Sequence, residues 1–181
     1  VDRRIPRERI YPFGIPIDPR FSESPNVGTI RRRLQLGADI PTILLMGGGQ
    51  GLGPIPEVVE ALDAVDRPFQ LAVVTGSNEK LYHKLIEKVP ALKHLTQVFG
   101  HVEFISDLMS VASLIITKPG GLTTSEALAK GLALVLINPI PGQEVKNAHF
   151  LIQAKVALQA DSSGALTTMA KDLFDHPEIL K

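Results

Sequence analysis

The sequence predicts an α/β fold, a Rossmann-like parallel sheet with helices on both of its faces. Short apolar runs alternate along the chain with longer segments of helical periodicity. Strands that are apolar throughout are typical of parallel sheets buried between two layers of helices. The 181 residues, 44% of them apolar, suffice for one domain with a substantial core. We expect residues 42–181 to form that domain and residues 1–41, which are rich in proline and arginine, to be a basic connecting segment.

The elements are expected in strict alternation. In chain order, the expected strands are Thr42–Met46, Gln70–Val74, Thr96–Phe99, Leu114–Thr117, Ala133–Ile137 and Ala157–Gln159. The helices that follow them are Ile55–Val65, Asn78–Val89, Ile105–Val111, Leu122–Lys130, Gln143–Ala154 and Ala165–Asp175. Asn78 is a suitable N-cap because its side chain can accept a hydrogen bond from the first turn. Before the first strand, Asn26–Leu36 is expected as one basic helix ended by Gly37.

The composition excludes several classes of protein. Lysine plus arginine equals aspartate plus glutamate at 19 each, so the net charge of zero argues against a dedicated nucleic-acid binder. Cysteine is absent, which excludes disulfides and fits a reducing compartment. No apolar run approaches the roughly 18 residues of a membrane-spanning helix. The histidines show no metal-ligand spacing, so we expect neither a metal nor a cofactor.

A glycine-rich loop follows the first strand and reads Gly47-Gly48-Gly49-Gln50-Gly51-Leu52-Gly53. Glycine lets a backbone approach a ligand closely and adopt a positive φ. The dinucleotide fingerprint fails because Leu52 stands at its last glycine position, and a phosphate-binding loop with lysine fails because Pro54 follows Gly53. Two interpretations remain, a ligand-binding loop and a tight turn that binds nothing.

The segment from Thr117 to Asn147 places polar groups at the ends of two neighbouring strands. Lys118-Pro119-Gly120-Gly121 joins the fourth strand to a helix that opens with Gly120, Gly121, Leu122 and Thr123. A helix N-terminus at the carboxyl edge of an open α/β sheet is suited to a phosphate group. Alternatively, Thr123 or Thr124 is simply the cap of that helix. Glu126, one turn further on, either binds a ligand or closes a capping box with Thr123.

The residues of several motifs resemble those of one protein family. The matching pieces are Gly14-Ile15-Pro16-Ile17, Leu45–Gly49, Gly100-His101-Val102, Thr117–Gly121, Thr124–Ala127 and Pro141–Glu144 with Asn147. In this order they resemble the C-terminal, nucleotide-sugar-binding half of family 28 glycosyltransferases, and within it the branch that glycosylates diacylglycerol. The resemblance implies half of a two-domain fold known as GT-B, so we expect the chain to be a fragment whose acceptor-binding half is missing.

The resemblance also implies roles for individual residues. It places the uracil of UDP on the backbone of Val102, with His101 packing on the base or serving as an ordinary loop residue. It implies that Gly120, Gly121, Leu122 and Thr123 bind the diphosphate and that Glu126 accepts hydrogen bonds from the ribose hydroxyls. Gly48, Gly49 and Gln50 fall near the diphosphate and the acceptor. Gln143 and Glu144 fall on the hexose with Asn147 nearby, unless these polar residues only start a helix.

The implied reaction is the inverting transfer of glucose or galactose from a UDP-sugar to diacylglycerol. The general base of the family lies in the other half, so we expect no catalytic residue in this chain and no turnover by it alone. Basic residues, Arg31-Arg32-Arg33 with Arg3, Arg4, Arg7 and Arg9, either form a solvated face or contact anionic lipids. The resemblance implies a peripheral position on the cytoplasmic face of a membrane, bacterial rather than plastid.

Other functions remain open on this sequence. One is the related transfer of N-acetylglucosamine to a lipid-linked peptidoglycan precursor, and another is a non-catalytic UDP-binding module. A nicotinamide oxidoreductase is disfavoured by the broken fingerprint. Two departures from the family pattern concern Ala133, where proline is common, and Lys155, near which a glycine is usual.

Overall fold

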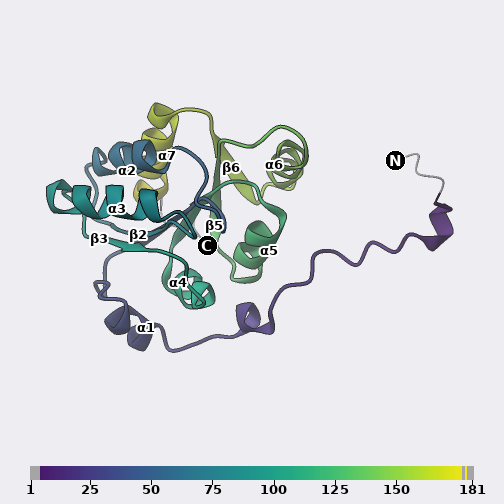
Figure 1. Ribbon diagram of the computed structural model, residues 1–181, viewed down its shortest axis with the longest axis horizontal. Helices are drawn as coiled ribbons and strands as arrows, with labels where there is room; N and C mark the ends of the chain where they lie inside the picture. Colours follow the sequence, from purple (N-terminus) through teal and green to yellow (C-terminus); the bar gives the residue numbers. More distant parts are fainter. Residues whose placement is uncertain (1–4, 177, 179–181) are drawn as a thin grey trace.

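A computed structural model describes residues 5–176 and 178, and its centre is a six-stranded parallel sheet (Figure 1). The strands lie in the order β3-β2-β1-β4-β5-β6. Their bounds are β1 Thr42–Met46, β2 Gln70–Val74, β3 Thr96–Phe99, β4 Leu114–Thr117, β5 Ala133–Ile137 and β6 Ala157–Ala160. This is the strand order of the Rossmann fold, and the predicted fold class is therefore confirmed. Five strands have the predicted bounds, and β6 is one residue longer.

The central strands are hidden from solvent on both faces. Every residue of β1, β2 and β4 is buried, as expected for strands that are apolar throughout. Met46 is paired with Val74 on one side and with Thr117 on the other. The carboxyl ends of these three strands are therefore level, and the loops that follow them leave the sheet at one edge.

Helices cover both faces of the sheet (Figure 1). The helices α2 (Ile55–Asp63), α3 (Glu79–Lys88) and α7 (Ser163–Asp175) bury one face. The other face is covered by α1 (Val27–Arg33), α4 (Ile105–Val111), α5 (Gly121–Ala129) and α6 (Gln143–Gln153). Alternate residues of β1 divide between the two cores, with Ile43 on one side and Leu44 on the other. Three short 3-10 helices complete the described chain, η1 Arg7–Arg9, η2 Pro19–Ser22 and η3 Val89–Ala91.

Capping side chains fix where several helices begin and end. Asn78 accepts a hydrogen bond from the N–H of Leu81, which confirms the predicted cap of α3. Ser162 accepts one from Ala165, and α7 consequently starts two residues before the predicted position. The basic helix α1 is shorter than predicted, because the chain leaves the helical conformation at Gln35, whose φ is 55°, and not at Gly37.

Arg31 has a structural role that the sequence did not reveal. Its guanidinium donates to the carbonyl oxygens of Gly37, Ile40 and Val111 at 2.7, 3.0 and 3.1 Å. Burial lowers the pKa of this group. Neither of the two interpretations of the arginine cluster, a solvated face or a lipid contact, holds for Arg31, because its terminal N–H groups donate to carbonyl oxygens of the fold.

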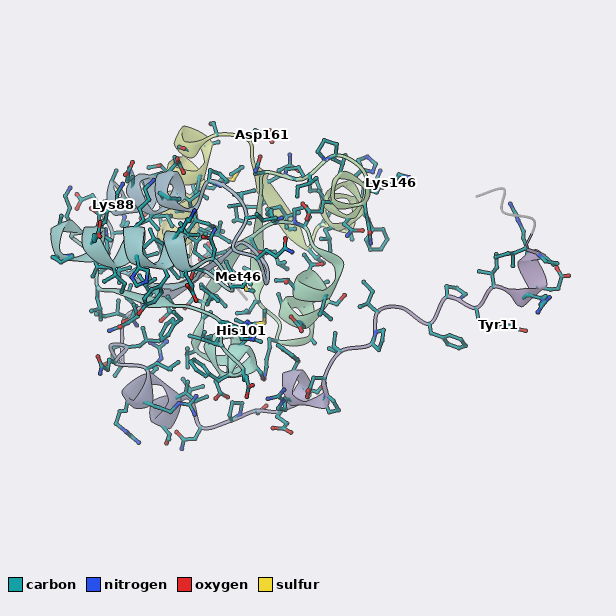
Figure 2. All side chains as sticks on the ribbon, in the orientation of Figure 1. Tyr11, Met46, Lys88, His101, Lys146 and Asp161 are labelled. Carbon is teal, nitrogen blue, oxygen red and sulfur yellow. The ribbon has the colours of Figure 1, made fainter. Side chains whose placement is uncertain are left out.

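The first 41 residues divide into a packed part and an arm. Phe21, Ile30, Leu34 and Leu36 are buried in the core beneath α4 and α5. Upstream, the segment around η1 extends away from the body, and Tyr11 lies far from the sheet (Figure 2). Phe13 in this arm is 92% exposed. Among the described residues, no helix is both long and apolar enough to cross a membrane.

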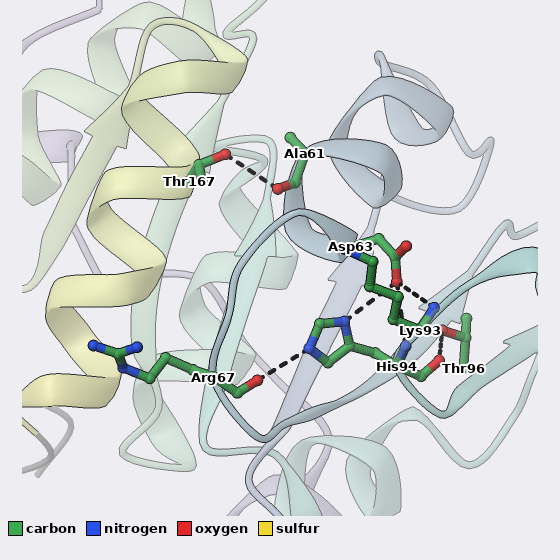
Figure 3. Close-up of polar contacts among 7 residues, drawn as sticks. All are labelled: Ala61, Asp63, Arg67, Lys93, His94, Thr96 and Thr167. Atoms are coloured by element: carbon green, nitrogen blue, oxygen red, sulfur yellow. Dashed lines mark hydrogen bonds and ion pairs between the residues drawn. The ribbon is translucent and has the colours of Figure 1, made fainter.

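A polar network closes the edge of the sheet opposite the strand carboxyl ends (Figure 3). The carboxylate of Asp63, the last residue of α2, accepts from the backbone N–H groups of Lys93 and His94 at 2.8 and 3.2 Å. The ring of His94 bridges Asp63 to the carbonyl oxygen of Arg67 and stacks on Phe69 at 3.9 Å. An acidic residue at a helix C-terminus is unfavourable by itself, so these contacts explain its place there.

Replacing Asp63 by alanine should therefore destabilise the fold. The change leaves two backbone N–H groups and an imidazole without their acceptor, which should lower the free energy of unfolding by about 1–3 kcal/mol. The matched control is Asp66→Ala, three residues later, where the side chain is exposed and the change should stay within about 0.5 kcal/mol. Urea denaturation of both variants measures the difference, and equal effects would contradict the assignment.

Candidate functional site

The candidate site lies where the strand order reverses. The chain leaves β1 for α2 on one face of the sheet and leaves β4 for α5 on the other. The loops after these two neighbouring strands therefore diverge, and open α/β sheets bind ligands in the crevice that results. The glycine-rich loop that starts at Gly47 and the turn that starts at Lys118 form its two sides.

The N-terminus of α5 presents unpaired donors at this crevice. Gly120 is the N-cap without any capping side chain, and the first intrahelical bond runs from the N–H of Thr124 to its carbonyl. Among the described residues, the N–H groups of Gly121, Leu122 and Thr123 have no acceptor. Thr124 directs its hydroxyl backwards to the carbonyl of Gly120 at 2.9 Å. Neither threonine is therefore a cap, and the helix end can accept an anion.

Glu126 lies one turn into α5 and is half-buried. No hydrogen bond or ion pair to its carboxylate is formed by the described part of the chain, so the capping box with Thr123 is not present. Burial raises the pKa of Glu126, and the nearby carboxylate of Asp18 raises it further. A partly desolvated carboxylate without donors has acceptor capacity for an incoming ligand, and perturbed acids of this kind concentrate at functional sites.

Polar side chains after β4 and β5 contact one another beside the crevice. Lys118 is buried, and its Nζ lies 3.4 Å from Oε1 of Glu144. The second oxygen of Glu144 accepts from the N–H of Ile140 at 2.9 Å. Asn147 donates to the carbonyl oxygen of Pro119 at 3.0 Å. The first residues of α6 thus hold the turn that precedes α5.

Gln143, by contrast, is exposed at the start of α6. It forms no side-chain hydrogen bond within the described residues. Gln143 and Asn147 both lie on α6, but only Asn147 reaches the turn before α5.

The glycines of the glycine-rich loop are of two kinds: some are required by close packing, and others lie beside open space. A Cβ at Gly51 would lie 2.1 Å from the carbonyl oxygen of Thr75, so this glycine is required because the loop packs on the end of β2. The loop is tied there by the N–H of Ser77, which donates to Gly49 at 2.9 Å. At Gly48 and Gly49 a Cβ would meet no atom within 4 Å. Those two glycines and the exposed Gln50 leave room for a ligand.

His101 and Val102 lie further along the edge, after β3. They line a cavity of about 630 Å³ whose other wall is the start of α3, including Tyr82 and His83. His101 is exposed, whereas Val102 packs against the core cluster beneath α4. These two predicted residues are therefore separate from the contact network of Lys118, Glu144 and Asn147.

Three residues beside the crevice were not predicted from the sequence. Lys118 was expected only as part of a turn, and its burial is a consequence of the tertiary fold. Ile15 packs at the N-terminus of α5, where its Cδ1 would lie 2.8 Å from a Cβ on Gly121. Asp18 lies near enough to Glu126 to influence its pKa. The signal was the Gly14–Ile17 motif, which was noted without a role. Among the described residues, no three acidic or histidine side chains are grouped to hold a metal.

Comparisons with known proteins show the family of this chain. The sequence profile described as glycosyltransferase family 28 C-terminal domain matches residues 42–174. The processive diacylglycerol beta-glucosyltransferase of Bacillus mycoides strain KBAB4 is 38% identical over 165 residues, which cover 90% of this chain and 42% of that protein. The protein of the same name from Bacillus cytotoxicus is 34% identical over 97% of this chain and 44% of the relative. The chain spans less than half the length of these curated relatives.

Solved structures support the fold. Acinetobacter baumannii MurG has a TM-score of 0.66 at 24% identity and covers 88% of this chain and 48% of its own. WaaG, a glycosyltransferase involved in lipopolysaccharide biosynthesis, has a TM-score of 0.71 at 20% identity, with 92% and 47% covered. Because the profile match extends over most of the chain and both Bacillus relatives exceed 30% identity, the chain belongs to glycosyltransferase family 28 and carries the C-terminal domain of that family.

Proposed function

We propose that this chain is the donor-binding domain of an inverting glycosyltransferase that transfers a hexose from a UDP-sugar to diacylglycerol. The proposal rests on two neighbouring features: within the described residues, the first N–H groups of α5 have no acceptor, and the carboxylate of Glu126, one turn later, has no donor. Donors for a diphosphate and an acceptor for a ribose diol are thus one helical turn apart. The names of the Bacillus relatives support glucose and diacylglycerol as the substrates.

The donor would lie along the carboxyl edge of the sheet. Its diphosphate would accept from the N–H groups of Gly121, Leu122 and Thr123, and its ribose would donate to Glu126. The base would lie against His101 and Val102, and the hexose would reach Glu144. Gln143, whose side chain is exposed at the same helix start, is assigned to the hexose on the family resemblance.

Asn147 would stabilise this arrangement without contacting the diphosphate. Its amide holds the carbonyl of Pro119 and so fixes the turn from which α5 starts. On the opposite side, the free space at Gly48 and Gly49 would leave the glycine-rich loop open to the diphosphate and to the acceptor, with Gln50 at its tip.

The contribution of this domain to the reaction would be electrostatic. In the inverting transfer, an acceptor hydroxyl attacks the anomeric carbon, the bond to UDP breaks, and negative charge develops on the departing diphosphate. Fixed N–H dipoles at the start of α5 would stabilise that charge without reorganising. The general base that takes the hydroxyl proton would come from outside this chain, as would the contacts to diacylglycerol. We place the enzyme at the cytoplasmic face of a membrane by peripheral association.

A second candidate is transfer of N-acetylglucosamine to a lipid-linked acceptor. It stays open because the family resemblance covers this reaction as well; the likeness to MurG, at 24% identity, concerns the fold alone. The donor panel UDP, UDP-glucose, UDP-galactose and UDP-N-acetylglucosamine, titrated calorimetrically into the purified chain, distinguishes the two candidates. Tightest binding of UDP-N-acetylglucosamine would favour the second.

UDP should bind this chain without a divalent metal. The charge of the diphosphate would be balanced by helix N–H groups. Within the described residues, no group of three or more acidic or histidine side chains is arranged to hold a metal ion. Titration of UDP in EDTA and in Mg²⁺ should give dissociation constants within about threefold. A loss of about tenfold or more on chelation would contradict this account of the phosphate site.

Glu126→Ala should weaken UDP binding and spare the fold. Loss of charge-assisted hydrogen bonds to the ribose, worth about 1.5–3 kcal/mol, should raise the dissociation constant of UDP about ten- to hundredfold. Binding of 2′,3′-dideoxy-UDP should be nearly indifferent to the change. Glu57→Ala, an exposed first-turn glutamate of α2, is the matched control and should leave both ligands unaffected. Equal weakening of UDP and its dideoxy analogue by Glu126→Ala would contradict the ribose assignment.

The raised pKa of Glu126 predicts a pH dependence of stability with a definite sign. Because the folded chain holds the proton more tightly than the unfolded chain, the stabilising contribution is complete below the ordinary value of 4.5 and is lost as pH rises through the folded pKa. In Glu126→Gln this side chain no longer titrates, so the variant does not lose that stability as the pH rises. The free energy of unfolding of Glu126→Gln relative to the unaltered chain should therefore increase from pH 4 to pH 7. Denaturant titrations at each pH measure it, and a decrease would show that a donor pairs with the carboxylate.

A further inference from the structure

The least explained charge in the described fold is the ammonium of Lys118, at the floor of the crevice. The residue is 7% exposed and follows the last residue of β4. Its aliphatic chain runs close to the glycine-rich loop, since a Cβ on Gly53 would lie 3.9 Å from its Cδ. Burying an ammonium is costly unless it is paired and hydrogen-bonded. This position therefore calls for a specific partner.

The partner is Glu144, but the pair is poorly suited to stabilising the fold. The distance of 3.4 Å from Nζ to Oε1 is long for a charge-assisted hydrogen bond. Within the described residues, the other two N–H groups of the ammonium have no acceptor. Replacing both members of a buried ion pair by apolar side chains is often neutral or stabilising, so such a pair is weak evidence for a role in stability. The lysine at this position is thus better explained by what it does to Glu144 than by stability.

Lys118 fixes the orientation of the Glu144 carboxylate. It holds one oxygen, while the N–H of Ile140 holds the other at 2.9 Å. A carboxylate can accept about four hydrogen bonds, so two positions remain for a ligand. The side chain of Glu144 is 20% exposed, so these positions are reachable from the crevice. Both donors approach from the loops at the strand ends, which leaves the carboxylate oriented and still unsaturated.

We infer that Lys118 is a positioning residue that orients Glu144 toward the hydroxyl groups of the donor hexose. The inference rests on the proposed function and deepens it by naming what sets the affinity for the sugar moiety. Lys118 would act on the hexose through Glu144 and would leave the nucleotide contacts at α5 unchanged. Its removal should therefore affect UDP-hexoses and not UDP.

The test compares UDP with UDP-glucose and UDP-galactose by calorimetric titration of the full chain. In Lys118→Met the dissociation constant of the tighter UDP-hexose should rise about tenfold, while that of UDP changes by less than about twofold. Glu144→Gln should give the same pattern, and the double variant should be no worse than either single variant. Lys146→Met, an exposed lysine on α6 (Figure 2), is the matched control and should change neither ligand.

Thermal unfolding separates this role from a structural one. Lys118→Met should change the midpoint little, because Glu144 is partly exposed and keeps its hydrogen bond from the N–H of Ile140. Glu144→Gln should lower the midpoint because it leaves the buried ammonium unpaired. If Lys118→Met instead weakened UDP and UDP-hexoses equally and lowered the midpoint, the residue would be a structural ion pair and the inference would be wrong. Failure of the unaltered chain to bind UDP would overturn the proposed function. If UDP binds but neither variant changes the difference in affinity between UDP-hexose and UDP, the inference is wrong and the proposed function still stands.

Discussion

The reversal of strand order between β1 and β4 is the constraint on which the rest of the molecule depends. Because both strands are buried and their ends are level, the chain must leave them in opposite directions to cover both faces of the sheet. The crevice between the two loops follows from this topology. It places a helix N-terminus, the turn after β4 and the glycine-rich loop around one volume, before any side chain has been specified.

The residues around the crevice are of two kinds. Some hold its loops in place, and others have polar groups that are free to bind a ligand. Gly51 is required by the close packing of the loop on β2, and Asn147 holds the turn before α5. By contrast, the first N–H groups of α5 and the carboxylate of Glu126 have no partner in the described chain. The main physical argument for a ligand there is that these unpaired donors and a half-buried carboxylate lie together at the strand-order reversal.

Much of this fold could be predicted from the sequence, because strand ends and helix starts depend on residues that are close together in the chain. The apolar runs of the strands end at glycine, proline or polar residues, so their bounds were predicted almost without error. The start of α5 and the cap at Asn78 follow from turn chemistry. The contacts that join distant segments were not accessible, since Lys118 meets Glu144 across 26 positions and Arg31 meets Val111 across 80. Those contacts depend on how the loops pack, which no local pattern specifies.

A crystal structure of the chain with UDP would show whether the start of α5 and Glu126 form the nucleotide site. We expect the diphosphate within hydrogen-bonding distance of the N–H groups of Gly121–Thr123 and the ribose hydroxyls on the carboxylate of Glu126. A UDP molecule bound instead in the cavity between α3 and His101, with its diphosphate away from α5, would contradict it.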